Sequence, residues 1–425
     1  MKLTPCAVLI STSVFIACSP VSEPLHLDIV GEGQLLEPPE PLEGVQYKMV
    51  ATVAPGHESY GCQLFTAPPE GLFVNREEVR FGPGGHHVLL YRTPYKEIPT
   101  TNELGEPVDA GAFHDCSAGA TALWKVNGVL GGSESFGGTG LLDQLPEGVA
   151  VAIEPGAVLL MSTHYLNATP ADIEVDSRIN LYSIPRDNVV AEAGVLYFDN
   201  PIIRVPAHGE STARMRCPIS KDISIVSLQS HMHSRGVRFA AHLAGGGAAA
   251  PAQIYSTTTW KEPPVAIFNP PLAVTAGQAI EYRCSYQSTE PRDVIRGLGE
   301  ADEMCQLIGP YYPRDMRLEA CLDEDGGPAA TWIGNGSATC GQTLSCLMMA
   351  PPIEEDGGKE AWGCVLNSCP GAAEAVSELV RCRLTRGRGQ CSNECGGEAL
   401  KEACETCLAH ACKDAVNACN CAECK

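Results

Sequence analysis

The cysteines constrain the fold of this chain more than any other residue type does. The 425-residue sequence contains 21 of them, and their distribution is uneven. Six lie between residues 62 and 321, whereas thirteen lie between residues 340 and 424. This change in density predicts a domain boundary near residue 325, and a chain of this length favours two or three domains. We expect residues 326–425 to form a small domain held together by disulfides.

The N-terminus has the features of a bacterial lipoprotein leader. Lys2 supplies a positive start, an apolar run extends from residue 7 to residue 17, and the small Ala17 precedes Cys18. We predict a signal peptide over residues 1–17 and lipidation of Cys18, with ordinary signal-peptidase cleavage nearby as the alternative. Residues 18–44 are rich in proline and glutamate and are predicted to form an extended tether. The predicted location is the bacterial cell envelope, at the outer membrane, with membrane contact through the lipid alone.

Export to the envelope implies that the remaining cysteines form disulfides. Removing Cys6 with the leader and reserving Cys18 for lipid leaves 19, an odd number, so one thiol is unpaired, binds metal or forms a crosslink. Stretches rich in Ala, Glu and Leu over residues 372–384 and 397–418 predict short helices pinned by cysteines. Zinc is the alternative for the last cysteines, but zinc modules usually pair two knuckles at wider separation. These candidates are Cys404, Cys407, Cys412, Cys419, Cys421 and Cys424.

The sequence before residue 325 has the pattern of short strands between turns. Strand-like runs cover residues 88–92, 158–164, 223–239 and 279–286, and glycine and proline separate them. We predict an all-β fold of two tandem antiparallel, jelly-roll-like β-sandwiches, at residues 45–186 and 187–325, followed by the helical Cys-rich tail. The formal net charge of −22 leaves no basic stripe for a nucleic acid.

Three histidine and methionine signatures predict a metal protein. They are His86-His87, His231-Met232-His233 and Asp302-Glu303-Met304-Cys305. Two strand residues that are two apart share a face, so His231 and His233 can reach one metal. Adjacent His86 and His87 can do so only where the strand bends or ends, which the preceding glycines allow. Imidazole suits copper in both oxidation states, and a thioether is a soft donor that favours Cu(I).

Each signature has a simpler interpretation when it is taken alone. The HxH pair is also typical of an exposed surface, and His164, late in an apolar run, is also typical of a hydrogen-bonded core histidine. Met304 follows the polar stretch 297–303, so it is not obvious core filler. A disulfide at Cys305 would hold the backbone beside it rigid. The combination of signatures therefore carries the metal hypothesis, and no single one does.

Taken in order, these signatures resemble the ascorbate-dependent type II copper monooxygenases. That family includes peptidylglycine α-hydroxylating monooxygenase and dopamine β-monooxygenase, and the resemblance covers roughly residues 45–325. The matching segments are residues 86–91, Thr163-His164-Tyr165, His231-Met232-His233, Arg283-Cys284 and Asp302-Glu303-Met304-Cys305. Tyr311-Tyr312-Pro313, with the segment 318–321, is closer to the dopamine β-monooxygenase branch.

The resemblance implies two copper ions held by six side chains. The electron-donating copper would be bound in the first sandwich by His86, His87 and His164. The oxygen-activating copper, where catalysis would occur, would be bound in the second by His231, His233 and Met304. The resemblance also implies three disulfides, which use every cysteine of this region: Cys62–Cys116, Cys217–Cys321 and Cys284–Cys305.

One departure from the family limits the substrate. In the peptide-amidating branch an arginine before the HxH pair, and an asparagine and a tyrosine after the methionine, hold the substrate carboxylate. Gln229, Gln306 and Ile308 stand at those positions here. No cation remains there, so we do not expect a peptide ending in glycine as the substrate.

The leading hypothesis from the sequence is an envelope-anchored copper monooxygenase. It would hydroxylate a C–H bond of a small organic substrate with O2 and a one-electron reductant such as ascorbate. A non-catalytic copper-binding or electron-transfer lipoprotein is the first alternative. A tail that binds a surface partner, with the β-region as its scaffold, is the second.

Overall fold

The computed structural model describes residues 36–82, 84–109, 111–117, 119–133, 140–247, 250–351, 356–395 and 401–424, without the side chains of residues 86, 388 and 401. Residues 36–425 form one compact unit. The predicted leader and Cys18 lie outside the described residues. Within the described part, no helix combines the length and the apolar character needed to cross a membrane.

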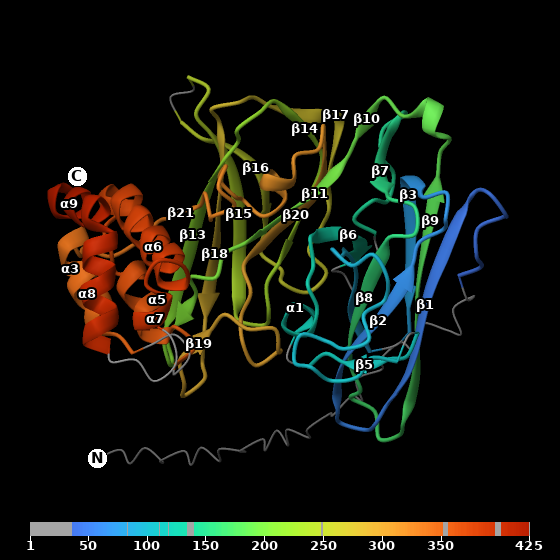
Figure 1. The fold of residues 1–425 in the computed structure, drawn as a ribbon, viewed down its shortest axis with the longest axis horizontal. Helices are drawn as coiled ribbons and strands as arrows, with labels where there is room; N and C mark the ends of the chain where they lie inside the picture. Colours follow the sequence, from blue (N-terminus) through green and yellow to red (C-terminus); the bar gives the residue numbers. More distant parts are fainter. Residues whose placement is uncertain are drawn as a thin grey trace, which may run out of the picture. The chain divides into compact units, whose positions relative to one another are not determined.

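Two five-stranded sheets make up the first half of the described chain (Figure 1). Their inward side chains, among them Met49, Val79, Leu159 and Met161, share one hydrophobic core. We call these sheets sheet 1 and sheet 2. The outer face of sheet 2 is covered by a four-residue helix, α1 (Ala120–Leu123), and by the Cys62–Cys116 disulfide. In sheet 1 the order is β1 (Gly44–Val53), β9 (Ile173–Ser183), β3 (Leu72–Phe81), β7 (Val149–Ile153) and β10 (Ala191–Glu192). In sheet 2 the order is β5 (His114–Asp115), β2 (Glu58–Thr66), β8 (Val158–Leu166), β4 (Gly85–Arg92) and β6 (Gly128–Ser133).

A four-stranded and a five-stranded sheet make up the next segment, with a second core between them. Phe198 and Leu307 of sheet 3 enter this core from one side, and Phe239 and Tyr282 of sheet 4 enter it from the other. In sheet 3 the order is β11 (Gly194–Asp199), β20 (Gln306–Tyr312), β14 (Ile223–His231) and β17 (Ala266–Val274). In sheet 4 the order is β16 (Ala252–Thr257), β15 (Gly236–Ala244), β18 (Ala279–Gln287), β13 (Glu210–Pro218) and β21 (Thr331–Trp332). The short β12 (Arg204–Val205) and β19 (Val294–Ile295) pair with each other, and α2 (Met316–Glu319) follows β20.

The tail is helical and stapled by disulfides, as the cysteine pattern predicts. Its helices are α3 (Cys340–Met349), α5 (Lys359–Leu366), α6 (Ala373–Arg388), α7 (Ser392–Cys395), α8 (Lys401–Ala411) and α9 (Lys413–Cys421). Trp332 and Trp362 bury their rings in the same core as sheet 4, and the Trp332 amide donates to Ser377 Oγ of α6 at 2.8 Å. The tail helices therefore extend the second core, and the predicted domain boundaries stay predictions.

The disulfides account for all but one of the described cysteines. The first three are Cys62–Cys116, Cys217–Cys321 and Cys284–Cys305, the pairs that the resemblance implies. The tail contains Cys340–Cys419, Cys346–Cys364, Cys369–Cys424, Cys382–Cys412, Cys391–Cys407 and Cys395–Cys404. The exposed Cys421 is the unpaired thiol that the odd count requires. Five of the six zinc candidates are thus engaged in disulfides.

The β-rich class and several antiparallel sheets are confirmed, and the jelly-roll sandwich topology stays a prediction. One strand prediction is wrong in its extent. Residues 223–239 form two strands, β14 and β15, because the chain turns between them, where the Gly236 amide donates to the His233 carbonyl at 2.9 Å. The turn places His233 beyond the end of its strand.

A buried carboxyl group holds the ends of a loop in the first half of the chain. Glu77 Oε1 accepts the Leu142 amide at 2.6 Å, and its Oε2 accepts the Gly132 amide at 3.0 Å. The side chain is completely buried, and this burial raises the pKa of Glu77 from its ordinary 4.5 to about 8. Glu77 therefore adds a pH-dependent term to stability.

We predict that Glu77→Gln lowers the free energy of unfolding by about 1–3 kcal/mol at pH 5, because an amide NH2 would face a backbone N–H. The folded-state pKa is raised, so the stability that the protonated carboxyl contributes is complete below about pH 4.5 and is lost as the pH rises through about 8. The deficit of the variant should therefore shrink between pH 5 and pH 8. Urea denaturation at both pH values measures it, and parallel pH profiles would contradict the assignment.

Candidate metal centre

Two of the predicted histidines stand directly opposite each other in sheet 2. His87 of β4 is paired with His164 of β8, which is in turn paired with Tyr60 of β2. The His87 and His164 ring centroids are 5.2 Å apart, and Tyr60 stacks on the His164 ring at 4.1 Å. Residues paired across neighbouring strands share a face. These three rings therefore form one row on the outer face of sheet 2.

A β-bulge occurs where two adjacent histidines require the strand to bend. The pairing of β4 with β8 changes register between Gly85 and His87, so His86 is the inserted residue. A bulge changes which side of a sheet the following residues face, so two neighbouring residues need not point in opposite directions. The side chain of His86 lies outside the described part of the structure, so its membership of the centre stays a prediction.

The second histidine pair lies at the end of β14, and a bulge also sets its direction. The register of β14 with β20 shifts between Ile225 and Gln229. Before the shift Ile225 points into the second core, and after it Leu228 does. His231 consequently lies on the opposite face, with Ile308, which packs against the core of the first half. The His231 and His233 rings are both buried, and their centroids are 5.3 Å apart.

Hydrogen bonding by the neighbouring Glu303 brings Met304 toward the HxH turn. Glu303 Oε2 accepts the His233 amide at 3.0 Å, and β20 begins two residues after Met304, where Gln306 is opposite His231. The Cys284–Cys305 disulfide and a hydrogen bond from Tyr286 Oη to the Met304 carbonyl, at 2.7 Å, fix the backbone on either side. The backbone at the buried Met304 is thus fixed close to the HxH turn, and its role as a ligand stays a prediction.

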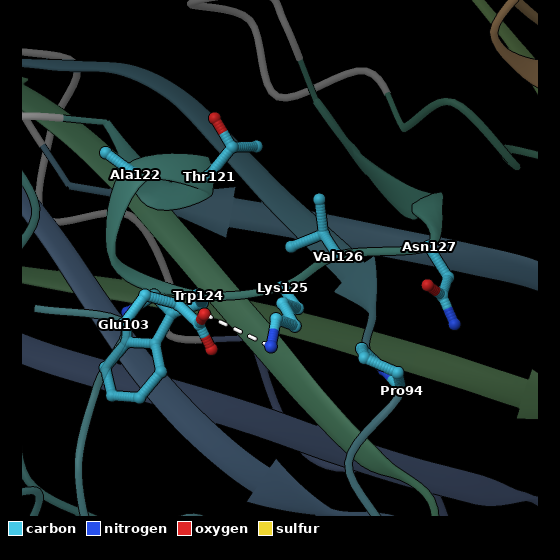
Figure 2. Close-up of a pocket in the computed structure, with 8 residues that line it drawn as sticks. All are labelled: Pro94, Glu103, Thr121, Ala122, Trp124, Lys125, Val126 and Asn127. Carbon is cyan, nitrogen blue, oxygen red and sulfur yellow. Dashed lines mark ion pairs between the residues drawn. The ribbon is translucent and has the colours of Figure 1, made fainter. Parts of the chain in front are cut away.

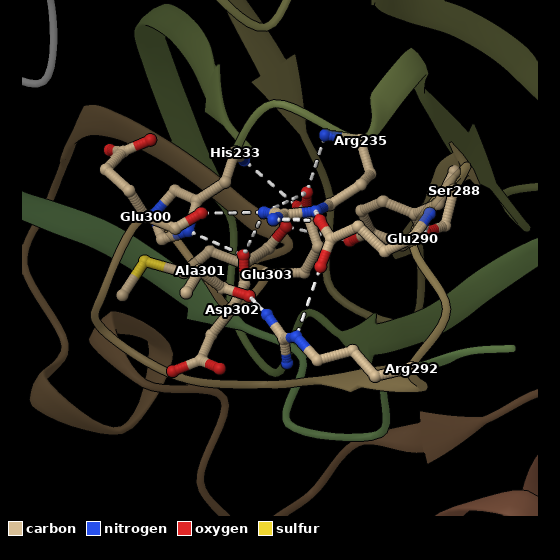
Figure 3. A network of polar contacts seen from close by, with 11 residues as sticks. His233, Arg235, Ser288, Glu290, Arg292, Glu300, Ala301, Asp302 and Glu303 are labelled. Carbon is tan, nitrogen blue, oxygen red and sulfur yellow. Dashed lines mark hydrogen bonds and ion pairs between the residues drawn. The ribbon is translucent and has the colours of Figure 1, made fainter. Parts of the chain in front are cut away.

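Arg235 lies in the turn that follows the HxH pair, residues 233–236, and its side chain connects this turn to the segment 300–303 by hydrogen bonds (Figure 3). Its Nη1 donates to the Glu300 carbonyl at 2.6 Å and the Asp302 carbonyl at 3.0 Å, and its Nε donates to Glu290 at 2.7 Å. Glu303 is fully buried and accepts the backbone amides of residues 233 and 235, at 3.0 and 2.8 Å. Burial raises the pKa of Glu303 to about 7. The Asp302-Glu303 part of the motif therefore supports the turn.

A backbone carbonyl selects the tautomer of His233. Its Nδ1 lies 3.1 Å from the Asp302 carbonyl oxygen. A carbonyl oxygen only accepts hydrogen bonds, so Nδ1 carries the proton and Nε2 is the nitrogen that a metal would take. The same segment that places Met304 thus also orients His233.

The structure brings the two histidine groups next to each other. His87 and His231 have ring centroids 6.3 Å apart. The loop between β19 and β20 approaches the row on sheet 2, and ligand atoms of Glu58, His164 and Glu300 all lie within 4.8 Å of one another. His164 Nε2 and Glu58 Oε1 are 2.7 Å apart, and this hydrogen bond is the largest influence lowering the pKa of Glu58. Five of the six predicted ligands are therefore assembled in one region.

The donor sets fit the metal that the sequence predicts. With metal–nitrogen bonds of about 2 Å, two imidazoles on one metal have ring centroids roughly 5 Å apart. The His87–His164 and His231–His233 separations, 5.2 and 5.3 Å, have this value. Met304 follows Glu303, which binds the backbone of the His231–His233 turn, and a thioether beside two imidazoles would suit Cu(I).

Three positions correspond to those that bind the substrate carboxylate in the peptide-amidating branch, and they lie together beside His231. Gln229 is paired with Ile308, and His231 with Gln306, so all four share one face of sheet 3. Gln229 donates to the Pro263 carbonyl at 3.2 Å, and Gln306 accepts from Tyr197 Oη at 3.1 Å. These amides and the Ile308 side chain bring no positive charge to this face.

Sequence reasoning did not find Glu58, Tyr60 or Glu300. Glu58 is 106 residues from His164, and β2 has no pattern that marks it as a site. A surface pocket of about 490 Å³ lies elsewhere, beside α1 (Figure 2). It is lined by Pro94, Glu103, Thr121, Ala122, Trp124, Lys125, Val126 and Asn127. None of these is a predicted ligand.

Comparison with known families agrees with this geometry for one segment. Residues 187–331 match the family model of the copper type II ascorbate-dependent monooxygenase, C-terminal domain. This segment contains His231, His233 and Met304 and covers the range predicted for the second sandwich. No curated protein matches the chain.

We predict that Arg235→Met destabilises the protein by about 3–5 kcal/mol. It removes the cation whose Nη1 lies 3.9 Å from the buried Glu303 Oε1, and it removes the donor from two carbonyls. Arg292→Met is the matched control. Arg292 also pairs with Glu290, at 3.1 Å, but its side chain is 46% exposed, against 12% for Arg235. The control should lose less than about 1 kcal/mol in denaturant titrations. Equal losses would show that Arg235 is an ordinary surface charge.

Proposed function

We propose that this protein is a copper monooxygenase that hydroxylates a C–H bond of a small organic substrate, using O2 and a one-electron reductant such as ascorbate. The observation that carries the proposal is the assembly of His231, His233 and the Met304 segment inside the region that matches the family model. Two imidazoles and a thioether are a donor set suited to Cu(I).

Each group of side chains would have one task. His231, His233 and Met304 would hold the oxygen-activating copper, and His86, His87 and His164 the electron-donating copper. Bound copper would supply one-electron transfer and oxygen activation. The protein's part is to orient the imidazoles through the two bulges and the Asp302 carbonyl, and to keep His231 and His233 buried from water.

The side chains around His231 support a substrate that is not anchored by a carboxylate. Gln229, Gln306 and Ile308 bring amide and apolar groups to the face that carries His231, and all three are buried. An amide offers no charge to a carboxylate that must lose water on binding. We propose a small neutral or cationic molecule, and no nucleic acid, as the substrate.

The proposed setting is the bacterial envelope. The lipobox at Cys18 and the proline-rich tether favour an outer-membrane anchor, in a compartment where nine disulfides persist. The tail packs on sheet 4 and leaves part of its helical surface exposed, so a surface partner for the tail belongs to this proposal.

We predict that Met304→Ile abolishes turnover while the fold is kept. Loss of a direct ligand should exceed the 10–100-fold effect typical of outer-shell changes, so product formation should fall by more than about 100-fold. Substrate-dependent O2 uptake by copper-loaded protein measures it, with the exposed Met316→Ile as control. Undiminished product formation would refute the catalytic assignment.

We predict that the protein binds two copper ions and that His164→Ala binds one. His164 is opposite His87 and remote in sequence from the HxH pair. Only the copper proposed at His86, His87 and His164, the first centre, should therefore be lost. Metal analysis after dialysis, with Cu(II) resonance spectra, gives the count. A copper protein that retains both ions in this variant would show that His164 is a core histidine.

A further inference from the structure

We infer that Glu58 is a positioning residue which fixes the tautomer of His164, so that its Nδ1 and not its Nε2 binds the metal of the first centre. This inference rests on the proposed copper site at His164 and adds a residue that the sequence signatures do not contain. It starts from the geometry of the outer face of sheet 2. On this face Glu58 and Tyr60, two residues apart on β2, flank the buried His164 ring.

The hydrogen bonds around Glu58 determine where the proton lies. Oε1 of Glu58 is 2.7 Å from His164 Nε2 and accepts the Tyr60 hydroxyl, also at 2.7 Å. An ionised carboxylate only accepts hydrogen bonds, so Nε2 must be the donor. In a neutral imidazole the other nitrogen then carries the lone pair. Nδ1 is consequently the atom that a metal would take.

The same contacts occupy one oxygen of the Glu58 carboxylate. A carboxylate oxygen has two lone pairs, and on Oε1 the imidazole N–H and the Tyr60 hydroxyl occupy both. Tyr60 also stacks on the ring at 4.1 Å, which restricts its rotation. A carboxylate that accepts from the distal nitrogen of a ligating histidine orients the ring and raises the basicity of the metal-bound nitrogen.

Glu300, from the second half of the chain, lies close to Glu58 and His164. Its carboxylate lies within 4.8 Å of the ligand atoms of Glu58 and His164. Its backbone carbonyl accepts Arg235 Nη1, in the network that supports His233. The backbone of Glu300, whose carboxylate approaches the Glu58–His164 pair, is therefore anchored by the turn that contains His233.

The test reads the tautomer directly. In protein with ¹⁵N-labelled histidine, long-range proton–nitrogen spectra should show His164 without metal as the Nε2–H form. Cu(I), which is diamagnetic, should then shift Nδ1. An Nδ1–H form, or a Cu(I) shift at Nε2, would overturn the inference. If no copper binds, the proposed function fails, while the spectrum of the metal-free protein still decides the tautomer.

Variants separate positioning from coordination. Glu58→Leu should lower the copper affinity of the first centre about 10–100-fold, and Glu58→Gln, whose carbonyl still accepts from Nε2, should lose less. Glu78→Leu is the matched control. Glu78 is on β3 and accepts the hydroxyl of Tyr182, on β9, at 2.9 Å. Among the described residues no hydrogen bond or ion pair joins Glu78 to a predicted ligand. This control should leave copper affinity unchanged. X-ray absorption that shows an oxygen ligand in the wild type and its loss in Glu58→Leu would make Glu58 a ligand and refute positioning.

Discussion

The bulge in β14 is the feature on which the arrangement of His231, His233 and Met304, the proposed second centre, depends. Side chains alternate along a strand, so the residues that face the second core before the bulge would continue to His231 if the register did not change. The shift between Ile225 and Gln229 exchanges the faces. Leu228 then fills the second core, and His231 faces the first half of the chain. One inserted residue thus turns a core position into a candidate ligand.

Both centres use this device, but they orient their histidines through different acceptors. In β4 the bulge at His86 precedes His87, as the bulge in β14 precedes His231. His233 gives its Nδ1 proton to the Asp302 carbonyl, and His164 gives its Nε2 proton to the Glu58 carboxylate. The segment from Glu300 to Met304 contacts both groups, because its first side chain approaches His164 and its carbonyls bind Arg235 and His233. The geometry of one centre is therefore mechanically tied to that of the other.

Local patterns predicted the parts of this site that depend on local geometry. The glycines before His86 predicted a bend, which the bulge in β4 provides, and the odd cysteine count predicted one thiol outside the disulfides, which is Cys421. Such features need only a flexible backbone or a count. The HxH spacing predicted two strand residues on one face, whereas His233 lies in the turn after β14. Glu58 and Glu300 could not be found in this way, because tertiary pairing alone brings them to His164. The extent of residues 223–239 was also misjudged, because a tight turn after an HxH pair leaves little trace in an apolar pattern.

The bulge also places the three residues that depart from the peptide-amidating branch outside the second core. Gln229, Gln306 and Ile308 are on the same face of sheet 3 as His231 but on the side away from the core that stabilises the sheet. Exchanging charged for neutral groups there changes no packing between sheets 3 and 4. Changing Leu228 or Leu307, by contrast, would open a cavity in that core and cost about 2–5 kcal/mol for truncation to alanine. The bulge therefore separates Gln229 and His231 from the core between sheets 3 and 4.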